Sequence, residues 1–344
     1  MSDPKPASGN SLELEGRSYR WIENWANQPD EEAARDGWAH HGLAVTSRGE
    51  VIAFHAGESQ LLVFTPDGEL SRSFECPVRE AHGQTLVEEN GVEYVWIADP
   101  GVKAVRQPNG SYGAKQPDVG GQAVKVGLDG TVALTLATPP LETYREAVYR
   151  PTAVAVDEER HGGSGDVWVT DGYGQNLIHR YNSAGEYQSS ISGEEGDAGA
   201  FDCPHSIFID RRRGDPELYI ADRSNARIQV YDLTGKFLRS FGEDFLNSPS
   251  AFALLGDRLI VAELFARLAV LGPDDTLVGY LGPDPEAKAR PGWPNAVAED
   301  GTTTRAPLQV GKFNSPHGIA TDPDGAIYIT EWLVGDRFTK LDPA

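Results

Sequence analysis

The chain has 344 residues, of which 39% are hydrophobic, with 38 glycines and 23 prolines spread along it. This composition is typical of a folded protein with many short strands and turns, and it argues against disorder over most of the chain. The formal net charge of −22 would repel nucleic acid phosphates and anionic lipid, so we expect neither nucleic acid nor a membrane as partner.

The sequence as given shows no secretory leader and no membrane span. The first nine residues lack an apolar segment, and no later stretch approaches the ~18 apolar residues that cross a bilayer. Cys76 and Cys203 are too few for a disulfide framework in a chain of this length. Together these features predict a cytoplasmic protein.

The N-terminal region divides into two parts. Residues 1–15 are polar and without periodicity, so we expect a flexible lead that precedes a single domain spanning residues 16–344. Residues 17–25 alternate polar and bulky side chains, as a strand does. This strand has no neighbour in sequence with which to pair.

The rest of the chain repeats one pattern of paired strands. It is clearest at 203–210 with 217–223, and again at 315–322 with 326–332, while further units begin near His41, His82, Pro151 and Pro249. Each full unit has three recognisable strands and a fourth after a glycine-containing turn, whereas the sixth unit ends one strand short. The pattern predicts an all-β, six-bladed β-propeller with four-stranded blades.

The strand at 17–25 can complete the last blade, which would join the chain ends and remove open sheet edges. Unequal spacing between the units predicts insertions before Thr152 and before His317. One of these is the Gly/Pro-rich run from about Pro273 to Pro307, expected as a long loop over or beside one face.

In a propeller the first strand of each blade lines the channel, and its start lies on the same face as the end of the second strand. The six starts are His41, His82, Thr152, His205, Ser250 and His317. Imidazoles that converge on one point are ligands for a divalent metal such as zinc, and three protein ligands with an open position indicate a catalytic site. We therefore predict a metal site of His82, His205 and His317, with His41 as a further candidate.

The ends of the second strands form another ring, mostly acidic. Its members are His55, Asp99, Asp171, Asp222, Glu263 and Glu331. Acids after a strand often accept hydrogen bonds from backbone amides of nearby turns, so we expect a mainly structural role. His55, Asp171 and Glu331 remain additional candidates for the site, and Asp171 is expected to orient Tyr173.

The repeats resemble a known family. Units of the form Pro-His-(Ser/Gly)-Ile followed by Tyr-Ile-Ala-Asp-Arg look like NHL repeats, and the segments 151–157, 169–173, 204–206 and 221–229 are similar to peptidyl-α-hydroxyglycine α-amidating lyases. The resemblance covers blades two to six. It implies zinc, or another divalent transition metal, on His82, His205 and His317, with Tyr173 as general base and Arg223 as an active-site arginine. It also implies a calcium ion in the channel, held largely by backbone carbonyls.

The chain departs from this family at two site positions. Ala56 stands where the family has an active-site arginine, and Ser315 stands where it has a methionine two residues before the third histidine. The family's disulfide cysteines are also absent. The predicted metal site therefore resembles that of the lyase, whereas the substrate carboxylate clamp does not.

These observations lead to three hypotheses about function. The first is a metal-dependent lyase that breaks a C–N or C–O bond in a small hydroxylated substrate, a carbinolamide or a related hydroxy acid. The second is a metal-dependent hydrolase or lactonase on the same propeller, although lactonase propellers generally hold calcium with acids and amides. The third is a non-catalytic NHL binding scaffold. Bound metal at the channel mouth would discriminate, because a scaffold has no need of it.

Overall fold

The computed structural model describes residues 11–344 as a ring of antiparallel sheets around a central channel. The first strands of successive blades are neighbours around the whole ring, since β27 contacts β21 on one side and β3 on the other. Six sheets close this ring, so the predicted six-bladed propeller is confirmed.

Blades 1 to 5 have four strands each, in the order expected from the sequence repeats. They consist of β3 (Ala44–Val45), β4 (Val51–Phe54), β5 (Gln60–Phe64) and β6 (Leu70–Glu75) in blade 1; β7 (Gly83–Glu89), β8 (Val92–Asp99), β11 (Gln122–Gly127) and β12 (Val132–Leu136) in blade 2; β13 (Ala153–Val156), β14 (Val167–Thr170), β15 (Ile178–Tyr181) and β16 (Tyr187–Ile191) in blade 3; β17 (Pro204–Asp210), β18 (Glu217–Asp222), β19 (Arg227–Asp232) and β20 (Phe237–Phe241) in blade 4; and β21 (Pro249–Leu255), β22 (Arg258–Glu263), β23 (Arg267–Leu271) and β24 (Leu277–Leu281) in blade 5.

Blade 6 combines the two ends of the chain. Its sheet contains β27 (Pro316–Thr321), β28 (Ile327–Glu331) and β29 (Phe338–Pro343), followed by the N-terminal strands β2 (Arg17–Glu23) and β1 (Ser11–Leu14). The pairing of β2 with β29 runs from Tyr19↔Pro343 to Glu23↔Thr339, which confirms the predicted closure. Ser11–Leu14, expected as part of a flexible lead of residues 1–15, instead pair with β2 as a fifth strand. Residues 1–10 of that lead lie outside the described residues.

Six hydrophobic clusters hold the ring together, and each lies between two neighbouring blades. The cluster between blades 5 and 6 includes Trp21 of β2, which is fully buried against Phe313 with ring centroids 4.7 Å apart. Arg337 is also fully buried and forms ion pairs with Glu23 of β2 and Glu331 of β28. The N-terminal strand is therefore anchored both by apolar burial and by a buried charge network.

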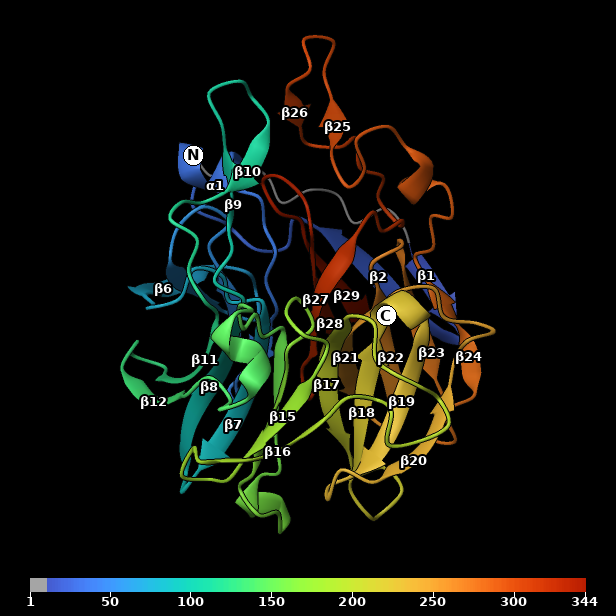
Figure 1. The fold of residues 1–344 in the computed structure, drawn as a ribbon. Helices are drawn as coiled ribbons and strands as arrows, with labels where there is room; N and C mark the ends of the chain where they lie inside the picture. Colours follow the sequence, from blue (N-terminus) through green and yellow to red (C-terminus); the bar gives the residue numbers. More distant parts are fainter. Residues whose placement is uncertain (1–10) are drawn as a thin grey trace.

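Two insertions rise from one end of the propeller. The hairpins β9 (Ala104–Arg106) with β10 (Tyr112–Ala114), and β25 (Ala296–Val297) with β26 (Thr303–Thr304), project at the same end in Figure 1. They touch there, because the amide of Thr303 donates to the carbonyl of Gly110 at 3.0 Å. The second insertion begins later than the predicted Pro273, since Leu277–Leu281 form β24 of blade 5. That segment alternates too weakly for its sequence alone to separate it from a loop.

Helical structure within residues 11–344 is limited to short turns. These are α1 (Glu32–Arg35) and the 3₁₀ turns η1 (Glu142–Arg145), η2 (Glu159–His161), η3 (Arg223–Asn225) and η4 (Ala287–Ala289). None of these has the length or the hydropathy of a bilayer-spanning helix.

Candidate metal centre

Three histidines from alternate blades meet on the propeller axis. His82, His205 and His317 lie at the first-strand starts of blades 2, 4 and 6, and all three are almost completely buried. Their ring centroids lie 4.6 Å (His82 and His205), 4.6 Å (His82 and His317) and 5.1 Å (His205 and His317) apart. The structure thus brings together the three imidazoles that the sequence placed on one face.

The odd-numbered blades fix how these rings are turned. Nδ1 of His82 lies 2.6 Å from the carbonyl oxygen of Thr152, and Nδ1 of His205 lies 2.7 Å from that of Ser250. Nδ1 of His317 similarly lies 3.2 Å from the carbonyl oxygen of His41. A carbonyl oxygen can only accept a hydrogen bond, so each Nδ1 carries the proton and each Nε2 presents a lone pair.

These lone pairs fit a metal ion. Nε2 of His82 and Nε2 of His317 face each other at 3.2 Å, with no proton available between them in that tautomer. Two nitrogens bound tetrahedrally to one zinc ion at the usual bond length would lie about 3.3 Å apart. Burial lowers the pKa of His82 to about 3 and also lowers the pKa of His205 and His317, which keeps the rings neutral, as ligation requires.

A fourth imidazole joins this group, and it belongs to His40 instead of His41. One ligand nitrogen from each of His40, His82, His205 and His317 lies within 4.8 Å of all the others; we call these four residues the histidine cluster. His41 occupies the blade 1 position equivalent to His82, but its Nε2 pairs with the buried Asp336 at 2.7 Å. The expectation for His41 was therefore wrong by one residue: its carbonyl supports the cluster, while its ring faces away.

Tyr173 and Arg223 adjoin the histidine cluster. The Tyr173 hydroxyl lies 2.9 Å from Nε2 of His205, 3.1 Å from Nε2 of His82 and 3.1 Å from Nε2 of His40. A guanidinium nitrogen of Arg223 donates to the same hydroxyl at 3.4 Å. Burial raises the pKa of Tyr173 to about 12, and it outweighs the opposing effect of Arg223.

The carboxylates of the second ring hydrogen-bond to backbone amides. Asp171 accepts hydrogen bonds from the amides of Arg150 and Gln175, and Glu331 accepts from those of Asn314 and Ser315. Asp99, Asp222 and Glu263 bind amides just before the first strands of their own blades. These carboxylates fix the chain where it enters each first strand, and so they position the histidines indirectly.

Two of the additional candidates act in the same structural way. The Nδ1 atom of His55 accepts from the amides of Gly57 and Glu58, and its Nε2 lies 3.0 Å from Glu31. The Asp171 carboxylate accepts a hydrogen bond from the Tyr144 hydroxyl at 2.6 Å. Asp171 therefore braces the turn that carries Tyr173 without bonding to the Tyr173 hydroxyl.

Ala56, which stands where the amidating lyases have an arginine, lies in tightly packed surroundings. Ala56 is 3% exposed, and a Cβ atom on the neighbouring Gly57 would lie 2.2 Å from the carbonyl oxygen of Ala33 in α1. The chain before blade 1 thus packs tightly over this position. A lysine that follows β8 of blade 2 lies in the same region. The buried Nζ of Lys103 is 5.3 Å from the centroid of the Phe54 ring and 2.8 Å from the carboxylate of Glu80.

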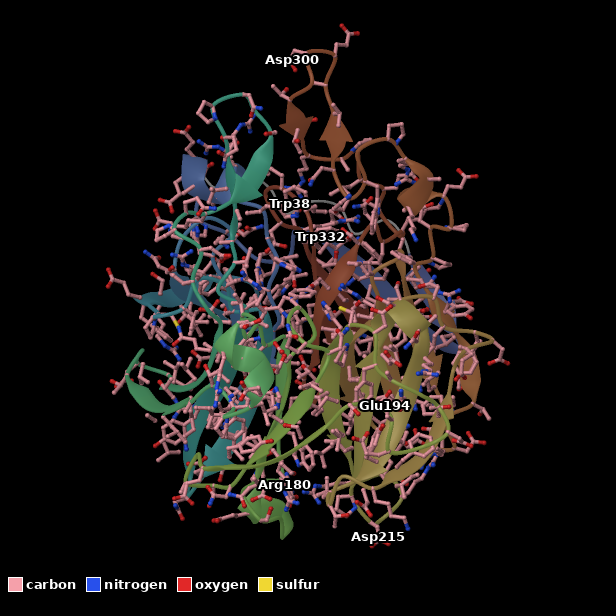
Figure 2. All side chains as sticks on the ribbon, viewed as in Figure 1. Trp38, Arg180, Glu194, Asp215, Asp300 and Trp332 are labelled. Carbon is pink, nitrogen blue, oxygen red and sulfur yellow. The ribbon has the colours of Figure 1, made fainter. Side chains whose placement is uncertain are left out.

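A belt of aromatic rings borders the histidine cluster on the side of the insertions. Phe265, Trp293, Trp332, Trp38 and Tyr112 form this aromatic belt, with successive centroids 5.7, 5.9, 5.5 and 5.3 Å apart. Trp332 also contacts His40, with ring centroids 5.7 Å apart, and the Nε1 atom of Trp38 has no hydrogen-bond partner within residues 11–344. Figure 2 places Trp38 and Trp332 at the end that carries the two hairpins. Sequence patterns did not indicate this belt, because its members come from five separate parts of the chain and share no repeat.

On its other side the cluster opens into the central channel. The first strands of all six blades line a cavity of about 650 Å³, with His82, His205 and His317 at one end of it. The site therefore combines the neutral imidazole nitrogens of the histidine cluster with Tyr173 and Arg223 at the mouth of the channel. Cys76 and Cys203 are both buried and unpaired.

Sequence comparison finds curated relatives of this chain. No protein-family model matches the sequence. The chain is 29% identical over 292 residues to human NHL repeat-containing protein 3, covering 77% of this chain and 76% of the human protein. It is 30% identical over 269 residues to peptidyl-alpha-hydroxyglycine alpha-amidating lyase 1 of Drosophila melanogaster, covering 73% of this chain and 42% of the fly protein. The chain has NHL-repeat proteins and an amidating lyase among its relatives. The resemblance stated from the sequence is thus confirmed.

Solved structures show the same fold in other enzymes. A streptogramin B lyase aligns with a TM-score of 0.57 and 16% identity, covering 95% of this chain and 98% of that one. A gluconolactonase from Xanthomonas campestris aligns with a TM-score of 0.57 and 12% identity, covering 98% and 97%. At these identities the likeness concerns the fold alone.

Proposed function

We propose that this protein is a metal-dependent lyase that cleaves a small hydroxylated substrate, a carbinolamide or a related hydroxy acid, at the channel mouth. The observation that carries the proposal is the convergence of three anchored Nε2 atoms beside Tyr173 and Arg223. The similarity to a peptidyl-α-hydroxyglycine α-amidating lyase supports the reaction class. The calcium ion in the channel and the cytoplasmic location stay predictions.

The chain supplies a distinct role for each group around the substrate. A divalent cation on the three nitrogens would supply Lewis acidity toward a substrate oxygen and would lower the pKa of the adjacent Tyr173. Tyr173 accepts the proton of the substrate hydroxyl, and its own oxygen lies 2.9–3.1 Å from Nε2 of His40, His82 and His205, so it adjoins the position that the ion would occupy. Arg223 neutralises an anionic substrate group, which Ala56 cannot do.

The bond changes balance for an N-acyl-α-hydroxyglycine as substrate. The hydroxyl O–H bond breaks and its proton goes to Tyr173, the oxygen forms a C=O bond with the same carbon, and the C–N bond breaks. The departing nitrogen takes this proton back from Tyr173, so the products are an amide and glyoxylate. No oxidant or reductant is needed.

Metal content and turnover test the proposal together. Protein purified without chelator is expected to contain close to one equivalent of a transition metal, and a variant with His82→Ala, His205→Ala and His317→Ala is expected to contain little. The wild type should release glyoxylate from N-benzoyl-α-hydroxyglycine, and Tyr173→Phe should slow this step by about 10²–10⁴-fold. Equally low metal in wild type and triple variant would refute the metal site.

A binding scaffold is the second candidate, because a human relative is an NHL repeat-containing protein. If the protein is a scaffold, we expect no tightly bound transition metal and no turnover of N-benzoyl-α-hydroxyglycine. A lactone assayed as a second substrate tests the hydrolase hypothesis, since a gluconolactonase shares the fold. Lactone opening that survives the triple histidine substitution would place hydrolysis elsewhere and count against the lyase.

A further inference from the structure

His40 differs from the other three imidazoles in how it is held. Its ring centroid lies 4.6 Å from His82 and 4.6 Å from His317, and its Nε2 lies 3.1 Å from the Tyr173 hydroxyl. In His82, His205 and His317 a carbonyl oxygen fixes Nδ1. Within residues 11–344 no such carbonyl fixes Nδ1 of His40. The ring is also half-buried, whereas the other three are buried.

The backbone around His40 is nevertheless held tightly. The amide of Ala39 donates to the carbonyl of Leu333, and the amide of Gly42 donates to that of Ala81, both at 3.0 Å. The neighbouring His41 is tied to Asp336. The main chain therefore places the His40 side chain at the cluster, while the contacts of its imidazole with other described residues are those with Tyr173, Trp332 and the neighbouring histidine rings. Such a ring can turn about its side-chain bonds without a change of the fold.

We propose that His40 is a fourth, exchangeable protein ligand of the metal ion held by His82, His205 and His317. The inference rests on the proposed metal site. In the resting state four imidazole nitrogens would surround the ion, and a substrate oxygen would replace His40. Catalytic zinc sites commonly keep their fourth position open to water, so a displaceable imidazole would instead keep water out until substrate arrives. Tyr173 and Trp332 are placed to receive the displaced ring, because both already contact it.

Cobalt(II) binding tests this proposal without any need for turnover. Wild type, His40→Ala, His40→Gln and the exposed control His161→Ala are freed of metal and titrated with Co²⁺ against a chelator. We expect the two His40 variants to bind Co²⁺ about 10–100-fold more weakly than wild type, as for removal of a supporting group at a metal site. Their visible absorption bands should move to longer wavelength, because water is a weaker-field ligand than imidazole. Added imidazole should restore the spectrum of His40→Ala.

The outcomes separate this inference from the proposed function. Identical affinity and spectra in wild type and both His40 variants would overturn the role of His40 while leaving the three-histidine site intact. A spectral change in Tyr173→Phe, with none in His40→Ala, would assign the fourth position to tyrosine and likewise overturn it. If wild type binds no Co²⁺, the metal site itself fails, and both proposals fail with it.

Discussion

Lowering the pH from 7 to 5 should destabilise the fold through His179, which braces the turn that carries Tyr173. His179 is fully buried in β15, with Nε2 2.8 Å from the Tyr144 hydroxyl and Nδ1 2.7 Å from Oγ of Ser190. The same Tyr144 hydroxyl donates to Asp171. Burial lowers the pKa of His179 to about 3.

The sign and the size of the effect follow from proton linkage. In the unfolded chain the pKa of a histidine is about 6.5, so as the pH falls the unfolded state binds a proton that folded His179 does not bind. This contribution to stability is complete above pH 6.5 and is lost progressively as the pH falls toward 3. Between pH 7 and pH 5 the loss from this one residue amounts to about 2 kcal/mol.

Urea unfolding of wild type and His179→Gln at pH 7 and pH 5 measures this loss. Both proteins are kept metal-free, so that metal release contributes to neither value, and the exposed His161→Gln serves as control. Wild type and control should lose about 2 kcal/mol more than His179→Gln over this interval. If His179→Gln loses as much stability as wild type, then His179 is not held neutral by burial and the reasoning is refuted.

Three further predictions concern substrate contacts and closure of the ring. Arg223→Gln should lower kcat/KM for an anionic N-acyl-α-hydroxyglycine by about 10–100-fold, as expected for a hydrogen bond to a charged group, and should affect its neutral methyl ester far less. Trp332→Ala should raise KM for the N-benzoyl substrate by about 2–10-fold relative to the N-acetyl one, because a stacking contact is lost; an equal change for both would exclude stacking. Trp21→Ala should lower the free energy of unfolding by about 3–5 kcal/mol through a cavity between blades 5 and 6, whereas Val297→Ala on the exposed hairpin should leave it unchanged.

The repeat pattern was sufficient to predict the propeller and most of the candidate site. A strand that opens with histidine and a partner strand that ends in an acid recur along the chain. Because the blades are structurally equivalent, equivalent positions in them lie on one face of the propeller. That argument placed His82, His205 and His317 together, whereas Tyr173 and Arg223 were expected there only from the resemblance to the amidating lyases. It also predicted the closure of the ring by residues 17–25, because a blade lacking an outer strand leaves an open edge.

Other features depended on contacts between distant segments. Sequence equivalence favoured His41 over His40, but Asp336, which follows β28 at the other end of the chain, captures the His41 ring. The alternation of imidazoles from even blades with carbonyls from odd blades appears only when the ring is closed. The aromatic belt is likewise assembled from segments far apart in the sequence that share no periodicity.

The sequence by itself therefore determined the architecture and the face on which the chemistry lies, because these follow from a local pattern repeated along the chain. The tertiary structure alone decided which imidazoles point at one another, which tautomer each adopts, and how they lie against the aromatic belt. Side-chain direction depends on the partner that a group meets across the axis, and no repeat of local sequence specifies that partner.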